Sequence, residues 1–124
     1  MKKNCHFSVL KCAVSPTGDR IYVTNYSHHK LITLAMDGKI LSTFTGPELQ
    51  YQLGVYVFFL GHVLVCGYTS CTIIQMDREV RKKLATLGAI KDRVMNPVSV
   101  CYNSDTHTVI VGQFSNELNV LEVQ

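Results

Sequence analysis

The chain has 124 residues, of which 47% are hydrophobic and 17% are charged, and its formal net charge is +3. This length limits it to one domain of ordinary size, and the apolar content excludes a disordered chain. No apolar run approaches the ~20 residues of a membrane span, and no signal-peptide core follows Lys2 and Lys3. We therefore expect a cytoplasmic chain with no membrane partner.

The first strands are predicted close to the N-terminus. A turn signal, Pro16-Thr17-Gly18-Asp19, precedes a β-rich run at 21–25. After a polar loop come apolar runs at 31–36 and 40–44, which flank an Asp37-Gly38 turn. β-Branched and aromatic residues between short turn clusters are typical of consecutive antiparallel strands, and Asp-Gly is a strong hairpin signal.

The same pattern returns twice along the chain. The apolar triplet 21–23 recurs at 63–65 and 109–111, and each copy is followed at the same offset by an aromatic residue and a hydroxyl. A period in the forties with short strands is the signature of β-propeller blades. We predict an all-β fold, a partial β-propeller of about three four-stranded antiparallel blades. The three units are expected near residues 10–52, 53–96 and 97–124.

One segment favours a helix by composition and a strand by position. Residues 77–85 are rich in helix formers such as Glu79, Lys82 and Leu84. The repeat places 82–87 instead at an outer strand, where Lys and Arg discourage edge-to-edge pairing. We predict the strand.

The chain is short for a closed propeller. It holds fewer than three units of this length, whereas closed propellers typically have four to eight blades. We expect it to be a piece of a longer parent, or to close by self-association.

The cysteines are predicted to have a structural role and not to bind a metal. Their spacings contain no Cys-x-x-Cys pair that would predict a zinc site. Cys66 and Cys101 lie in or beside predicted strands, where a free Cys behaves as a small buried hydrophobe. We expect reduced, structural thiols at all five positions, Cys5, Cys12, Cys66, Cys71 and Cys101.

Positive charge is concentrated in one segment. Residues 78–93 contain six basic and two acidic side chains. Such a segment either binds phosphates or an acidic protein surface, or solubilises an edge strand and its loop. The candidate binding residues are Arg78, Arg81, Lys82, Lys83, Lys91 and Arg93.

Aromatic and histidine side chains mark the loops. Tyr26, Tyr68 and Phe114 occupy equivalent positions in the three units, so we expect them to line one rim of the arc. There they either contact a partner or pack against the neighbouring blade. His28 and His29 are further candidate partner contacts, but no third ligand accompanies them, so no metal is expected.

These motifs resemble a known repeat family. Ser15-Pro16-Thr17-Gly18-Asp19 followed by Tyr22-Val23-Thr24-Asn25 resembles an NHL repeat, which forms the C-terminal propeller of many tripartite-motif (TRIM) proteins. Residues 63–87 and 97–123 resemble the last blades of TRIM-like propellers. The literal Tyr-Val-Thr-Asn is also similar to the YVTN propellers, our second choice. The resemblance implies a non-catalytic module that docks protein or RNA, the target-recognition part of a TRIM-like ubiquitin ligase.

Enzyme activity is not expected of this chain. Phosphate-loop, dinucleotide, His-Glu-x-x-His and Gly-x-Ser-x-Gly motifs are missing from the sequence. The Cys/His ladders of RING and B-box modules, which would carry ligase activity, are missing too. No cofactor is predicted. The alternative is a fragment of a propeller hydrolase of the metal-dependent lactonase or esterase type.

Overall fold

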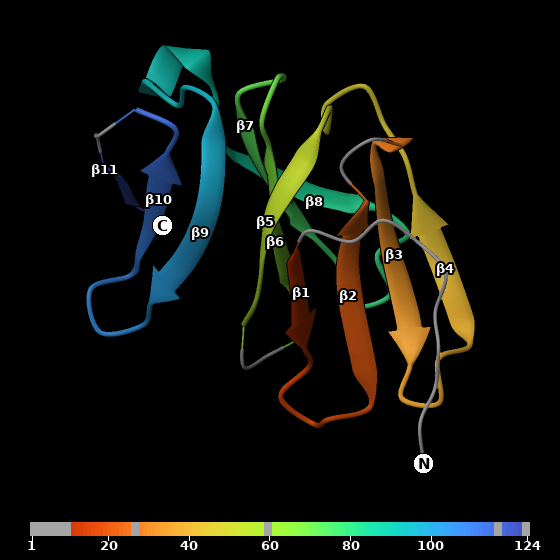
Figure 1. Ribbon diagram of the computed structural model, residues 1–124. Coiled ribbons are helices and arrows are strands. Elements are labelled where there is room, and N and C mark those ends of the chain that lie inside the picture. Colours follow the sequence, from red (N-terminus) through yellow and green to blue (C-terminus); the bar gives the residue numbers. More distant parts are fainter. Residues whose placement is uncertain (1–10, 26–27, 59–60, 116–117, 123–124) are drawn as a thin grey trace.

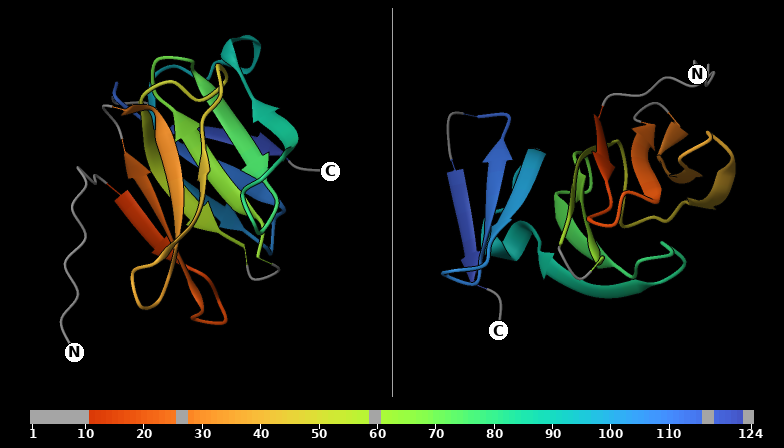
Figure 2. Two further views of the ribbon diagram at one scale, coloured as in Figure 1. Left: turned by 90° about the vertical axis from the view of Figure 1, so that its right-hand side faces the viewer. Right: turned by 90° about the horizontal axis from the view of Figure 1, so that it is seen from below.

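The computed structural model describes residues 11–25, 28–58, 61–115 and 118–122, and antiparallel strands dominate it (Figure 1). Three sheets follow one another in chain order across the molecule (Figure 2). No helix within the described ranges is long and apolar enough to cross a membrane.

Each sheet is a meander of consecutive strands, which we call blades 1, 2 and 3. Blade 1 consists of β1 (Lys11–Val14), β2 (Arg20–Asn25), β3 (Lys30–Ala35) and β4 (Ile40–Phe44). Blade 2 consists of β5 (Gln52–Val57), β6 (Val63–Gly67), β7 (Thr72–Met76) and β8 (Lys83–Gly88). Blade 3 consists of β9 (Pro97–Asn103), β10 (Thr108–Gln113) and β11 (Leu118–Glu122). The first strands of the blades lie next to each other, because β5 packs against β1 on one side and β9 on the other.

The ambiguous basic segment forms a strand, as the repeat predicted. β8 pairs with β7 through Thr86 opposite Ile74 and Ala85 opposite Gln75. Helix propensity is a weak preference that tertiary pairing overrides, and an isolated helix of this length is marginal. Only a short 3₁₀ turn, η2 (Ile90–Asp92), follows the strand.

Two of the three buried clusters of the core form layers that meet in blade 2, and the third, Val23, Ile32 and Leu34, lies within blade 1. Every side chain of β6 is buried. Val63 and Val65 pack with residues of blade 1 such as Tyr22, while Leu64 and Cys66 pack with residues of blade 3. Successive side chains of a strand point to opposite faces, so one apolar strand supplies both layers. The three blades are therefore joined through the middle of blade 2.

The cysteine prediction is correct at Cys66 and wrong at Cys101. Burial raises the pKa of the Cys66 thiol to about 12, so it stays protonated. Cys101 is exposed, because β9 turns Val100 toward the core and Cys101 to the other face. No further sheet covers that face within the described residues. The described cysteines are free thiols.

The β7–β8 turn is anchored on blade 1. The Tyr22 hydroxyl donates to the Arg78 carbonyl at 2.7 Å, and the Ser42 hydroxyl donates to the Glu79 carbonyl at 3.0 Å. The Arg78 guanidinium forms an ion pair with Asp19 at 2.7 Å. Contacts between residues this far apart in sequence fix the angle between blades 1 and 2.

Gly54 permits the close approach of β5 and β9. A Cβ atom there would lie 2.8 Å from the Ser99 Cα and 3.0 Å from the Val98 carbonyl oxygen, both backbone atoms. At Gly46 a Cβ would meet only the ring of Phe44, at 3.3 Å. We predict that Gly54→Ala lowers the free energy of unfolding by about 1–3 kcal/mol, and that Gly46→Ala costs less. Urea unfolding of the two variants measures this, and equal stabilities would contradict the close approach.

Asp19 makes stability depend on pH under acidic conditions. Hydrogen bonds from the Thr17 and Ser15 hydroxyls, then the charge of Arg78, lower its pKa from 3.8 to about 2. A depressed carboxyl pKa stabilises the fold above pH 3.8, and this contribution is lost as the pH falls through about 2. We predict that the melting temperature of Asp19→Asn falls less steeply across this interval than that of the wild type.

Thr17→Val is the second variant in that experiment. It removes the hydrogen bond that lowers the pKa most, so its slope should lie between those of the wild type and Asp19→Asn. Identical slopes in all three proteins would show that Asp19 is not responsible.

Candidate partner-binding rim

Loops from all three blades gather at one end of the sheets, which we call the rim (top of Figure 1). The rim consists of the connections β2–β3, β4–β5, β6–β7, β8–β9 and β10–β11. Strands in a meander alternate in direction, so every second connection returns to the same end. The alternating direction of the strands therefore places the candidate loop residues at the same end of the sheets.

Blades 1 and 2 are linked at the rim through His29. Its Nδ1 accepts a hydrogen bond from the Tyr51 amide at 2.9 Å, and the two rings meet edge to face at 4.3 Å. An Nδ1 that accepts carries no proton, so the neutral ring has its proton on Nε2. The buried Gln52 donates to the His29 carbonyl at 3.0 Å. His29 is thus held as a structural residue that joins blade 1 to the segment around Tyr51.

Blades 2 and 3 are linked by a second set of contacts. The Tyr68 and Phe114 rings meet edge to face at 6.2 Å. Asn96 lies between the two loops, since its side chain donates to the Tyr68 carbonyl at 3.2 Å and its carbonyl accepts from the Phe114 amide at 3.1 Å. Tyr68 and Phe114 therefore contact each other across the two blades, and packing against the neighbouring blade is one of the two alternatives considered for these loop aromatics.

Large apolar side chains are exposed where blades 2 and 3 meet. The exposed fractions are 65% for Ile90, 49% for Met95 and 76% for Phe114. We call these three residues the rim patch. Leu118 is 74% exposed but pairs with Gly112 on the face of blade 3 that points away from blade 2. Hydrogen bonds between backbone and side chains hold the neighbouring segments together: the Met95 amide donates to the Gln113 side-chain oxygen at 2.9 Å, and the Asn119 side chain donates to the Asp92 carbonyl at 3.0 Å.

The basic residues do not form one continuous patch. Arg78, Arg81 and Lys82 lie in the β7–β8 turn, at the other end of the sheets. Lys91 and Arg93 lie in and after η2, at the rim, and both are exposed. The strand β8 separates the two groups, and its six residues span roughly 20 Å at ~3.3 Å per residue.

Ion pairs further divide this positive charge. Arg78 is paired with Asp19, and Lys83 with Glu48 at 2.7 Å. Arg78 thereby joins the basic segment 78–93 to blade 1, and Lys83 joins it to the β4–β5 connection. Both pairs are partly exposed and contribute little to stability individually.

The remaining predicted residues are placed as follows. The exposed His28 contacts the Asn25 side-chain oxygen through its Nδ1 at 3.1 Å. Tyr26 lies outside the described residues. Among the residues that the structure describes, no group of three His, Cys, Asp or Glu side chains could hold a metal ion.

Sequence reasoning missed Tyr51 and most of the rim patch. Ile90 and Met95 lie in the crossing between units, and comparison of repeats does not align crossings. The strand order nevertheless indicated their position, because the connection from the last strand of one blade to the first strand of the next lies at the rim.

No family model and no curated protein matches this sequence. Solved structures do. Hydrazine synthase of Kuenenia stuttgartiensis superimposes with a TM-score of 0.78 at 14% identity, over 99% of this chain and 36% of that one. The Staphylococcus aureus virginiamycin B lyase, as the catalytically inactive H270A variant with quinupristin, has a TM-score of 0.64 at 13% identity, over 97% of this chain and 43% of that one. The selenomethionine-substituted form of the same lyase has a TM-score of 0.64 at 14% identity, over 90% of this chain and 40% of that one.

The chain therefore spans less than half the length of the proteins that it superimposes on. Similarity at such low sequence identity indicates a shared fold and does not indicate a shared activity. The three antiparallel sheets and these similarities together establish the architecture: this chain is a partial β-propeller of about three blades.

Proposed function

We propose that the chain is the docking part of a larger propeller and binds a partner protein through the rim patch, without catalysing a reaction itself. The rim patch is the observation that carries this proposal. Exposed apolar groups gathered at one place are typical of interaction sites, whereas single exposed apolar residues are not. An exposed Phe114 beside Met95 offers the aromatic and thioether groups that are enriched at protein interfaces.

A protein partner fits the rim better than RNA does. The cations at this end that the sequence analysis singled out are Lys91 and Arg93, whereas Arg78 and Lys83 are neutralised by carboxylates. Nucleic-acid binding relies on several phosphate contacts along a basic surface. Three exposed apolar side chains flanked by two cations suit a partner with an apolar, partly acidic surface.

The NHL-like motifs support a more specific role. The resemblance of residues 15–25 to an NHL repeat favours a TRIM-like parent, in which the propeller selects the target. Ligase activity would then belong to other domains of that parent. The rim patch would be the surface that distinguishes one target from another.

The test compares two apolar-to-acidic variants. Phe114→Asp changes the centre of the rim patch, and Met36→Asp is the matched control, because Met36 is 54% exposed in the β3–β4 turn at the other end. Proteins captured from a cell extract by the wild type are identified, purified and titrated. We expect Phe114→Asp to weaken binding about 30-fold, as for a hot-spot residue of about 2 kcal/mol, and Met36→Asp to leave it unchanged.

Two results would overturn the proposal. Equal binding by both variants would remove the rim patch as the docking surface. Capture that ribonuclease abolishes, and that the double variant Lys91→Gln/Arg93→Gln weakens more than Phe114→Asp does, would identify an RNA-binding rim.

The alternative of a metal-dependent hydrolase fragment has its own test. A metal that binds only the folded chain stabilises it by RT ln(1 + L/Kd), where L is the free metal concentration, so the melting temperature rises with metal concentration above Kd. We expect calcium and zinc to leave the melting temperature of the chain unchanged. A saturable rise with either ion would favour the hydrolase.

A further inference from the structure

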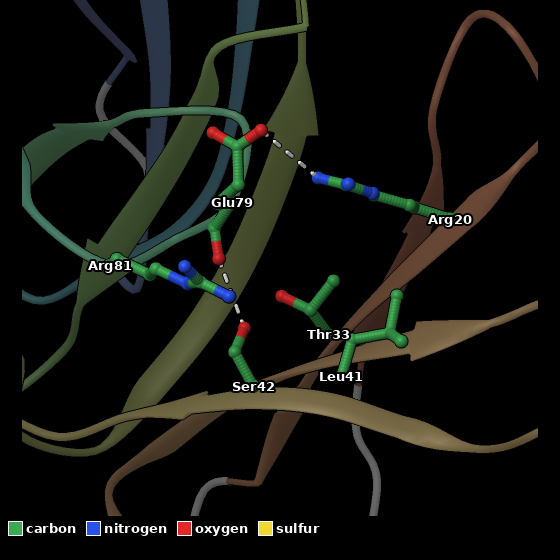
Figure 3. Close-up of a pocket in the computed structure, with 6 residues that line it drawn as sticks. All are labelled: Arg20, Thr33, Leu41, Ser42, Glu79 and Arg81. Carbon is green, nitrogen blue, oxygen red and sulfur yellow. Dashed lines mark hydrogen bonds and ion pairs between the residues drawn. The ribbon is translucent and has the colours of Figure 1, made fainter.

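A pocket lined mostly by polar residues lies between blades 1 and 2, at the end opposite the rim (Figure 3). Its volume is about 130 Å³, and it is lined by Arg20, Thr33, Leu41, Ser42, Glu79 and Arg81. Blade 1 supplies four of these side chains, and the anchored β7–β8 turn supplies the other two. The pocket therefore exists only because the turn docks on the sheet.

Thr33 presents an unpaired hydroxyl to this pocket. The residue is 1% exposed, and its Oγ1 has no hydrogen-bond partner among the described residues. Figure 3 shows the hydroxyl directed into the pocket, toward the side on which Arg81 lies. Buried hydroxyls in folded proteins almost always have a partner, so an orphaned one that faces a cavity indicates a missing ligand or water.

Two guanidinium groups border the same space. Arg20 uses Nη1 to reach the Glu79 carboxylate at 3.6 Å and the Arg78 carbonyl at 3.4 Å. Arg81 is exposed, and its guanidinium makes no ion pair within the described part of the chain. With Glu79 included, the pocket keeps an excess of one positive charge.

We propose that this pocket binds a phosphate group. Thr33 donates through its hydroxyl, Arg81 through its free guanidinium, and Arg20 through the N–H groups that Glu79 does not use. Donors that converge from three directions suit a tetrahedral oxyanion, and arginine is the side chain that matches phosphate best. The volume of about 130 Å³ accommodates one phosphate group, and the pocket is open to solvent on one side.

The phosphate is either free or carried by a small phosphorylated molecule, and one experiment distinguishes the two. Inorganic phosphate and O-phosphoserine are titrated into the full chain at constant pH and ionic strength, and backbone amide NMR shifts are followed. We expect saturable shifts at Thr33, Ser42 and Arg81. Tighter binding of phosphoserine would assign the site to a small phosphorylated molecule, and equal binding would assign it to free phosphate.

Thr33→Val separates a ligand-binding hydroxyl from a structural one. Valine keeps nearly the same shape and removes the unpaired oxygen, so this variant should melt at a higher temperature in phosphate-free buffer. Its phosphate affinity should fall by at least about tenfold, because a hydrogen bond to a charged group is lost. Phosphate also stabilises folded proteins in general, because it is excluded from their surface. This general effect is the same in Thr33→Val as in the wild type, so the difference between the two proteins reports only binding at the pocket.

Arg81→Gln tests the charge, with Lys39→Gln as its matched control. Both residues are exposed cations, but Lys39 lies in the β3–β4 turn and does not line the pocket. We expect a tenfold or greater loss of phosphate affinity in Arg81→Gln and none in Lys39→Gln. The proposal is wrong if the wild type shows no saturable shifts, if both charge variants lose affinity equally, or if Thr33→Val binds phosphate like the wild type.

Discussion

The burial of β6 on both of its faces is the interaction on which the arrangement of the three blades depends. Val63 and Val65 belong to the layer shared with blade 1, and Leu64 and Cys66 to the layer shared with blade 3. A sheet with one covered face tolerates a polar residue at every second position, but this strand tolerates none. Blade 2 is therefore the rigid centre against which the other two are oriented.

The two candidate sites lie at the two junctions that this strand creates. The rim patch lies where the β8–β9 connection meets the β10–β11 loop, and the pocket lies where the β7–β8 turn meets blade 1. Neither site belongs to a single blade. Gly54 extends the same principle, because the close contact of β5 with β9 requires a residue without a side chain. Changes in blade packing should affect both sites together.

Charge in this protein contributes to assembly of the fold as well as to recognition. In the sequence the cations of residues 78–93 form one basic run. In the structure, Arg78 and Lys83 face carboxylates of other segments, and Arg81 borders the pocket beside Arg20. A strand separates positions that are close in the chain, so a basic run in an outer strand and its loops does not become a basic surface.

The sequence by itself determined the strands, their order and the repeat, since alternating β-branched residues and turn signals act locally and recur in each unit. It also predicted the strand β8, because the repeat was a stronger signal than the local helix propensity. Only the tertiary structure decided which faces are covered. Cys101 is exposed, the Thr33 hydroxyl is buried without a hydrogen-bond partner among the described residues, and the side chains of Ile90 and Met95 are exposed. Strand order places Ile90 and Met95 at the rim, but no local pattern shows that their side chains are exposed. Coverage depends on contacts between blades, and those contacts join residues that are distant in the chain.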